Sequence, residues 1–416
     1  MVFGLFALSI LATVALLGWL FVLLHPARPW DFQPVGDAGP TPELPPGVEF
    51  PPVTIIVPAR NEAASLPKTL PALLNQDYPG PYHVLLVDDR SEDGTADAAR
   101  SLAESLQKTS RLTVLNGSPL PEGWTGKVWA LHQGIQAAPT VAGPDFVLLT
   151  DADIAHAPSS LRRLVAESLS GGLGLNSRMA RLHCASAAEK LLIPAFVFFF
   201  NLLYPMRRVN NTAHPAAAAA GGCMLLSWTA VYRLGGGLEA IRGEVIDDIA
   251  LARQVKALDL PIRLTLARAE VRSLREYPRL AEIWKMVRRT AFTELEHSWI
   301  RLALALGGLG LMFALPVLAV VGGVAGALAG ETLETTVLGL WALAKGGLGL
   351  AVMRAVYGPA ISFFDLPRRY AYALPVAGVL YGLMTLDSAL RHACGAPALW
   401  RDNQPAKPER DATTQV

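Results

Sequence analysis

Two acidic pairs, each placed just after a short apolar run, constrain the fold of this chain more than any other feature. The pair Asp88–Asp89 follows the run Val84–Val87, and the pair Asp151 and Asp153 follows the run Phe146–Leu149. Short uninterrupted apolar runs predict buried parallel strands, and open α/β sheets bind their ligands at the carboxyl ends of such strands. An Asp-x-Asp sequence at that edge suits a hard divalent cation that holds a diphosphate, because such cations prefer oxygen ligands.

Apolar runs alternate with helical segments from residue 53 onward. The expected strands cover 53–57, 84–87, 112–115 and 146–149, and the expected helices cover 62–75, 95–106 and 128–138. This alternation predicts an α/β fold in which a mostly parallel sheet carries helices on both of its faces.

Hydrophobic residues make up 52% of the chain, which is too many for an ordinary soluble enzyme. The excess lies in uncharged stretches. Val2–Leu24 has 23 residues without a charge, enough to cross a bilayer, and its lack of a basic start and cleavage site predicts an anchor. Leu302–Gly330, Thr335–Met353 and Tyr370–Leu386 predict further membrane segments, whereas the net charge of +1 does not indicate nucleic acid as a partner.

The chain therefore divides into five parts. They are an anchor (1–25), a linker (26–52), a catalytic α/β domain (53–295), a membrane region of about three hydrophobic segments (300–390) and a tail (391–416). The linker has nine prolines in 27 residues, which predicts an extended chain. Within the domain, the segment 188–208 suits a helix lying on lipid headgroups and equally a plain core helix.

Basic residues give the orientation. Arg354, Arg368 and Arg369 flank the loop between the last two hydrophobic stretches, whereas Glu331 and Glu334 lie at the opposite end of the third. The positive-inside rule then places the catalytic domain and the 354–369 loop in the cytoplasm. Four full spans would put the basic tail outside, so either the tail breaks the rule or one stretch is re-entrant.

The acidic positions have a functional and a structural interpretation. A carboxylate at the end of a strand can accept a hydrogen bond from a base N–H or a ribose hydroxyl, and it can equally cap the following helix. We favour ligand contact for Asp89 and capping for Ser91 and Asp93. For Asp151 and Asp153 the alternative to metal binding is a cap of the helix that follows.

Several motifs, in order, resemble family 2 glycosyltransferases with the GT-A fold. They are Val57-Pro-Ala-Arg-Asn-Glu62, Val87-Asp-Asp-Arg-Ser-Glu-Asp-Gly-Thr95, Gly126-Lys-Val-Trp-Ala-Leu131, Thr150-Asp-Ala-Asp153, Ala220-Gly-Gly-Cys-Met-Leu-Leu226 and Val245-Ile-Asp-Asp-Ile-Ala-Leu251. The resemblance runs from about 53 to 290. With its flanking anchors and the run 286–295, the chain is most similar to the hopene-associated branch found with bacterial hopanoid pathways.

The resemblance implies a pocket for a UDP-sugar and a bound cation. Asp89, with Asp88 behind it, would contact the base or ribose of the uridine. Asp153 would be the main ligand of Mg2+ or Mn2+, and Asp151 would touch the ribose or a metal-bound water. Such a cation neutralises the diphosphate leaving group. The other residues implied in nucleotide-sugar binding are Pro58, Ala59, Glu62, Lys127 and Arg288.

The resemblance also implies catalytic residues. Asp248 would be the general base that takes a proton from the acceptor hydroxyl, giving inversion at the anomeric carbon. The family usually has Glu-Asp where this chain has Asp247–Asp248, which puts the support from the first carboxylate in doubt. Glu244 is an alternative base, and an exposed acidic start of a helix is the structural alternative.

The family's Gln-x-x-Arg-Trp motif survives only as Met286-Val-Arg-Arg-Thr290. Arg289, or its neighbour Arg288, could clamp the diphosphate through its planar guanidinium, although paired arginines are also a routine cytoplasmic flank of a membrane segment. In polymer-making relatives the tryptophan supports the acceptor glycan. Its absence favours a single transfer over a processive polymerase.

We therefore expect a metal-dependent hexosyltransferase that moves one sugar from a UDP-sugar to a lipid hydroxyl at the bacterial inner membrane. The hopanoid connection rests on resemblance alone. The alternatives are transfer to a polyprenyl phosphate, extension of a polysaccharide, and a non-catalytic membrane scaffold that retains a nucleotide fold. The sugar and the oligomeric state stay open.

Overall fold

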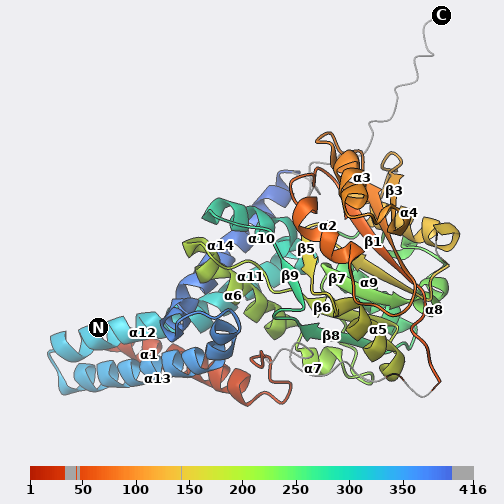
Figure 1. Cartoon of the computed structure of the whole chain (residues 1–416). Coiled ribbons are helices and arrows are strands. Elements are labelled where there is room, and N and C mark those ends of the chain that lie inside the picture. Colours follow the sequence, from red (N-terminus) through yellow and green to blue (C-terminus); the bar gives the residue numbers. More distant parts are fainter. Residues whose placement is uncertain (33–43, 45–46, 142, 396–416) are drawn as a thin grey trace, which may run out of the picture. The chain divides into compact units, whose positions relative to one another are not determined.

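The computed structural model describes residues 1–32, 44, 47–141 and 143–395, which fall into two compact units (Figure 1). The sheet unit contains the described residues from 44 to 181 and 217–274. The helical unit contains 1–32, 182–216 and 275–395. Most of the predicted linker and the tail from residue 396 onward lie outside the described residues, and the predicted domain bounds stay a prediction.

A seven-stranded sheet, in the order β3-β2-β1-β4-β7-β6-β8, forms the centre of the sheet unit as described. Strand β7 runs antiparallel to β4 and β6, and the other paired strands are parallel. The strands are β1 (Val53–Ala59), β2 (Tyr82–Asp88), β3 (Leu112–Asn116), β4 (Phe146–Thr150), β6 (Leu175–Met179), β7 (Cys223–Ser227) and β8 (Ile262–Leu266). The mostly parallel sheet confirms the predicted fold class. The strands β5 (Ile154–His156) and β9 (Val271–Ser273) pair separately.

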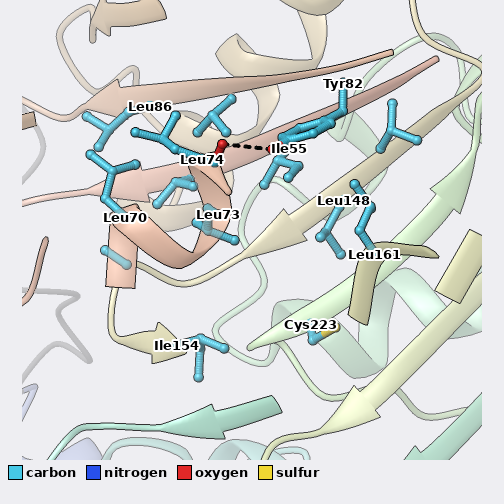
Figure 2. Packing of buried hydrophobic residues seen from close by; sticks show 14 of the residues in the cluster. Ile55, Leu70, Leu73, Leu74, Tyr82, Leu86, Leu148, Ile154, Leu161 and Cys223 are labelled. Carbon is cyan, nitrogen blue, oxygen red and sulfur yellow. Dashed lines mark hydrogen bonds between the residues drawn. The ribbon is translucent and has the colours of Figure 1, made fainter. Parts of the chain in front are cut away.

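Alternate residues of the strands face two different layers of helices. Odd-numbered residues of β1, such as Ile55, share a buried cluster with α2 (Leu66–Leu74), α3 (Thr95–Ser105) and α5 (Ser160–Gly171). Figure 2 shows this cluster, in which the Tyr82 hydroxyl donates to the Leu74 carbonyl at 2.8 Å.

The helix α4 (Gly126–Val141) covers the other face of the same strands. A Cβ built on Gly134 would lie 2.5 Å from Cγ2 of Ile56 and 3.2 Å from Cγ2 of Val87, so glycine is needed for α4 to approach this closely. Helices on both faces explain why the central strands are continuously apolar rather than alternating.

The first predicted helix begins later than expected, at Leu66 instead of residue 62. The amide of Glu62 donates to Thr95 Oγ1 at 2.9 Å, and the amide of Ala63 donates to Asp93 Oδ2 at 3.0 Å. These side chains satisfy the amides in a turn, so the prediction of a helix from 62 was wrong. The later segment Asp247–Ala257 is helical (α9), as its sequence indicated.

The sheet unit is completed by α8 (Trp228–Arg233) and two short 3-10 turns, η1 (Thr109–Arg111) and η2 (Glu239–Ile241).

The helical unit contains five segments long and apolar enough to cross a membrane, among the described residues: Val2–Leu24, Ala187–Val209, Trp299–Ala329, Leu333–Phe363 and Arg368–Ala393. The second contains the segment 188–208, for which the sequence suited a helix on lipid headgroups and equally a plain core helix. The helices are α1 (Val2–Leu24), α6 (Ala187–Leu203), α7 (Met206–Val209), α10 (Leu280–Glu294), α11 (Trp299–Leu309), α12 (Leu315–Ala329), α13 (Leu333–Phe363) and α14 (Leu374–Ala393), with a π turn η3 (Gly310–Ala314) and a 3-10 helix η4 (Arg368–Ala373).

Two groups of helices pack within this unit. The helices α1, α12 and α13 pack on one another, and α14 packs on α6, α10 and α11. Between α12 and α13 the backbones meet at glycines: a Cβ on Gly339 would lie 2.5 Å from the amide nitrogen of Ala327. Close backbone approach through small residues is the usual way that helices associate in lipid.

Candidate active site

The carboxyl ends of three parallel strands bring the first acidic residues together. The register pairs Ala59, the last residue of β1, with Asp88, the last residue of β2. Strand β4 lies on the other side of β1, with Leu149 opposite Ile56, so Asp151 leaves the sheet beside the end of β1. This is the edge at which open α/β sheets hold ligands, as the sequence indicated.

Hydrogen bonds from other elements fix the Asp-Ala-Asp turn after β4. The hydroxyl of Thr69, on α2, donates to the Ala152 carbonyl at 2.7 Å. The amide of Leu274, just after β9, donates to the Asp153 carbonyl at 2.9 Å. Because both bonds use the backbone, they hold the turn without occupying the two carboxylates.

Lys127, in the first turn of α4, lies at the centre of the site. Its ammonium Nζ is 3.0 Å from Oδ1 of Asp151 and 3.2 Å from Oδ2 of Asp247. The side chain of Lys127 is 15% exposed and that of Asp247 is 14% exposed, so both charges are largely withdrawn from water. The lysine therefore links the Asp-x-Asp turn after β4 with the acidic start of α9.

Asp248 is held next to this cluster by backbone amides. Its Oδ2 accepts a hydrogen bond from the Gly221 amide at 2.8 Å, and its Oδ1 accepts one from the Ile249 amide at 2.9 Å. A Cβ on Gly221 would lie 2.9 Å from Nζ of Lys127 and 3.4 Å from Oδ2 of Asp248. A glycine at this position thus lets the chain before β7 pass between the lysine and the carboxylate.

The electrostatics of the cluster suit acid–base chemistry near neutral pH. Burial and the neighbouring charge of Asp247 raise the pKa of Asp248 to about 6, against the opposing effect of Lys127 and the two amides. Burial lowers the pKa of the Lys127 ammonium, but Asp151, Asp247 and Asp248 outweigh burial and hold this pKa above its usual value. A lysine that stays cationic can contact a phosphate group. A carboxylate that titrates near 6 can accept a proton near neutral pH.

The pair Asp88–Asp89 is more deeply buried than the rest of the site. Asp89 is fully buried, and Nη1 of Arg60 lies 2.7 Å from its carbonyl oxygen and 3.4 Å from its Oδ2. Burial raises the pKa of Asp89 to about 6, although Arg60 and Arg90 oppose this. Asp88 is 8% exposed and accepts a hydrogen bond from the Ser91 amide at 3.2 Å.

Three further residues predicted for the nucleotide pocket lie beside this pair. Pro58 and Ala59 are buried in β1. Glu62 is also buried, and its Oε2 accepts a hydrogen bond from the Ser65 hydroxyl at 2.7 Å. Their contact with a nucleotide stays a prediction.

The predicted capping of α3 by Ser91 and Asp93 was wrong, because the N-cap of α3 is Gly94 and no side chain caps it. Asp93 Oδ1 accepts a hydrogen bond from the Thr95 amide at 3.0 Å, at the start of α3. The Ser91 hydroxyl accepts one from the Asn61 amide at 2.9 Å. Both side chains therefore hold the turns after β1 and β2 together.

The predicted cation site rests on two carboxylates. Within the described residues no group of three or more His, Cys, Asp or Glu side chains is arranged to hold a metal. The charge of Asp153 contributes to raising the pKa of Asp151, after burial and against Lys127, which indicates that the two carboxylates lie near each other. Two carboxylates fit Mg2+ or Mn2+, because such ions commonly take one or two protein carboxylates and complete their shell with phosphate oxygens and water.

Arg288 and Arg289 belong to the helical unit, on α10. Nη1 of Arg288 lies 3.3 Å from Oδ2 of Asp387, which also accepts a hydrogen bond from Trp284 at 2.7 Å. Arg289 is exposed. The predicted contact of both arginines with a diphosphate stays a prediction.

Sequence reasoning missed two residues of the site. Arg60 lies inside the quoted Val57–Glu62 motif, but an arginine in a turn does not by itself indicate that it faces Asp89. Gly221 lies inside the quoted 220–226 motif, yet only the fold shows that Lys127 and Asp248 both meet it. A glycine before a strand is a weak signal until its neighbours in space are known.

The mostly parallel sheet, with a lysine-bridged group of carboxylates at its strand ends, has the arrangement of the GT-A fold. Residues 54–227 match the family model described as Glycosyl transferase family 2.

Relatives match this chain over part of their length. The chain is 30% identical over 125 residues to the undecaprenyl-phosphate 4-deoxy-4-formamido-L-arabinose transferase of Aeromonas hydrophila, covering 29% of this chain and 34% of the relative. It is 34% identical over 102 residues to the 4,4'-diaponeurosporenoate glycosyltransferase of Staphylococcus haemolyticus, covering 24% of each. The chain thus spans about a third and a quarter of these two relatives.

A solved structure resembles the fold over most of the chain. It is the mannosyltransferase PcManGT from Pyrobaculum calidifontis in complex with GDP-Man and Mn2+, with a TM-score of 0.53 and 22% identity. The alignment covers 90% of this chain and 99% of that protein. The likeness supports the GT-A fold.

Proposed function

We propose that this protein transfers one sugar from a nucleotide sugar to an acceptor lipid in the membrane, with inversion at the anomeric carbon. The observation that carries the proposal is the cluster around Lys127, which joins Asp151 to Asp247 and adjoins Asp248 through Gly221. This cluster offers a proton acceptor and a cation in one place. The five apolar helical segments support an acceptor that stays in the bilayer.

In the proposed reaction Asp248 accepts the proton of the acceptor hydroxyl. The hydroxyl oxygen then forms a bond to the anomeric carbon while the bond from that carbon to the diphosphate breaks, and the nucleoside diphosphate leaves with the bonding electrons. Lys127 would stabilise, with its ammonium, the negative charge that develops on the leaving group. When bound, Mg2+ or Mn2+ neutralises the diphosphate, and Asp153 with Asp151 would hold it.

We propose a UDP-sugar as the donor, with Asp89, Asp88, Pro58, Ala59 and Glu62 around the nucleotide. We further propose that the protein lies in the bacterial inner membrane, with its sheet unit in the cytoplasm. A hopanoid-related lipid with a free hydroxyl is the first candidate acceptor, on the resemblance of the motifs and the flanking membrane segments.

A polyprenyl phosphate is the second candidate acceptor. It is favoured by the Aeromonas relative, whose name states that it acts on undecaprenyl phosphate. The two acceptors differ in one physical respect. A phosphate monoester is already ionised above its second pKa of about 6, so it needs no general base at pH 8, whereas a hydroxyl does.

The test measures nucleoside diphosphate release by the purified full chain, with a panel of UDP-sugars and GDP-mannose, Mn2+ or Mg2+, and each lipid in turn. With a hydroxyl lipid, Asp248→Asn should lower kcat/KM by about 10²–10⁴-fold. The wild-type rate should fall about tenfold per pH unit below the Asp248 pKa of about 6, because the base must be ionised to accept a proton.

Asp97→Asn is the matched control, since Asp97 has an 87% exposed side chain on α3. If the polyprenyl phosphate is the one lipid with which Asp248→Asn leaves the rate at pH 8 unchanged, the second acceptor is supported. If the protein binds UDP but releases no product with any donor and lipid, the proposed transferase activity is refuted. The non-catalytic membrane scaffold would then be the remaining interpretation. A ladder of products would refute the single transfer.

A further inference from the structure

The helix α13 is too long to lie entirely within a bilayer core. It begins at Leu333, next to the charged residues Glu331 and Glu334, and ends at Phe363. At about 1.5 Å per residue, the distance along the helix from Leu333 to Arg354 is about 32 Å, which matches a hydrocarbon core of about 30 Å. Arg354 therefore lies at the boundary opposite to Leu333, and the last turns of α13 lie at the depth of lipid headgroups.

A cavity of about 240 Å³ opens at this depth. Its lining comes from the end of α13 and from η4, and consists of Arg354, Ala355, Gly358, Ser362, Arg368 and Ala371. Two guanidinium groups and one hydroxyl thus line this cavity, and its other lining residues are small and apolar.

The charges of this cavity are unbalanced. No acidic residue is part of its lining. The Arg354 guanidinium lies over the ring of Tyr372, 5.2 Å from its centroid. In the part of the chain that the structure describes, neither Arg354 nor Arg368 forms an ion pair with a carboxylate. Two like charges that meet in one cavity are stabilised by an anion, and guanidinium groups match the oxygens of phosphate in a planar fork.

We propose that this cavity binds the phosphate group of a membrane lipid, with Arg354 and Arg368 on the phosphate oxygens and Ser362 as a further donor. The location favours a lipid over free phosphate, because the bilayer boundary presents headgroups at this depth and the small apolar residues leave room for the start of a tail. Arg354 and Arg368 are both exposed, as arginines that flank a membrane segment usually are. Here α13 and η4 direct two of them to one cavity.

The experiment measures lipid binding to the purified full chain in detergent by native mass spectrometry, with no nucleotide sugar present. The probes are a polyprenyl monophosphate, phosphatidylglycerol, the polyprenol that lacks a phosphate, and inorganic phosphate. We expect both phosphate lipids to bind at least about tenfold more tightly than the polyprenol. The double variant Arg354→Gln/Arg368→Gln should bind the phosphate lipids about tenfold more weakly than the wild type. Arg369→Gln, an exposed neighbour outside the cavity, should change it less than about twofold.

Thermal unfolding of each variant shows whether it folds. If Arg354→Gln does not fold, the single variants Arg368→Gln and Ser362→Ala test the same site. Equal binding by wild type and the double variant would overturn the proposal. So would equal binding of polyprenol and its phosphate, or complete displacement of the lipid by millimolar inorganic phosphate. Because donor turnover is not measured, these results are independent of the proposed transferase activity.

Discussion

At the scale of single residues, Lys127 is the centre of the proposed site. Its ammonium lies 3.0 Å from a carboxylate oxygen of Asp151 and 3.2 Å from one of Asp247. Without it, three carboxylates would share a largely buried space, and each would be harder to ionise. The lysine is therefore a positioning group for the carboxylates as well as a candidate contact of the diphosphate.

Lys127→Met should lower turnover by about 10²–10³-fold, the usual cost of losing one preorganised electrostatic contact in an active site. It should also move the acidic limb of the pH–rate profile to higher pH, because the Lys127 charge lowers the pKa of Asp248. Steady-state kinetics from pH 5 to 9 check both expectations. Lys68→Met, at an exposed lysine of α2, is the control. A lower rate with an unmoved pH profile would contradict the second role.

At the scale of elements, the connections decide which apolar helices cross the membrane. Strands β4 and β7 pair in one sheet, although α6 and α7 lie between them in the chain. Both strands must be on the same side of the membrane, so the segment Ala187–Val209 cannot cross it once. This favours the interfacial interpretation of that segment. The helix α14 packs on α6, on the amphipathic α10 and on α11, so we expect it to lie at the same surface as α6.

The pair α12 and α13 offers a test of helix packing. Gly339→Ala should destabilise the protein by about 1–3 kcal/mol, because the added Cβ would lie 2.5 to 2.8 Å from backbone atoms of α12. Gly347→Ala, on the same helix, is the matched control, since a Cβ there meets nothing within 4 Å. Thermal unfolding in detergent should show a lower Tm for the first variant alone. Equal Tm values would show that these helices can separate at little cost.

At the scale of the whole molecule, three crossings by α1, α12 and α13 would account for the charge distribution. If α14 lies at the surface, we expect Arg391 in its last turn to be on the same side of the membrane as Arg354 and Arg368. The conflict between four full spans and a basic tail then disappears, because one apolar segment does not cross.

Cysteine labelling tests this topology. Cys394, just after α14, is exposed, whereas Cys223 is buried. A membrane-impermeant maleimide should label Cys394 in inverted vesicles and leave it unlabelled in intact spheroplasts. Asp97→Cys, placed on α3 of the sheet unit in a Cys394→Ser background, should behave identically. Labelling of the two positions from opposite sides would show that α14 crosses the membrane.

The sequence by itself determined the strands that carry the site. Apolar runs and the acidic pairs that follow them are local features, and the positions of Asp88, Asp89 and Asp151 at strand ends follow from them. The tertiary structure alone decided the rest, because contacts between distant residues leave no local pattern. Lys127, Asp151, Gly221 and Asp247 come from separate elements, and only the insertion of the antiparallel β7 beside β4 brings them together. The same reason applies to α6, whose composition suits a span or an interface, and whose position is decided by the pairing of the strands on either side of it.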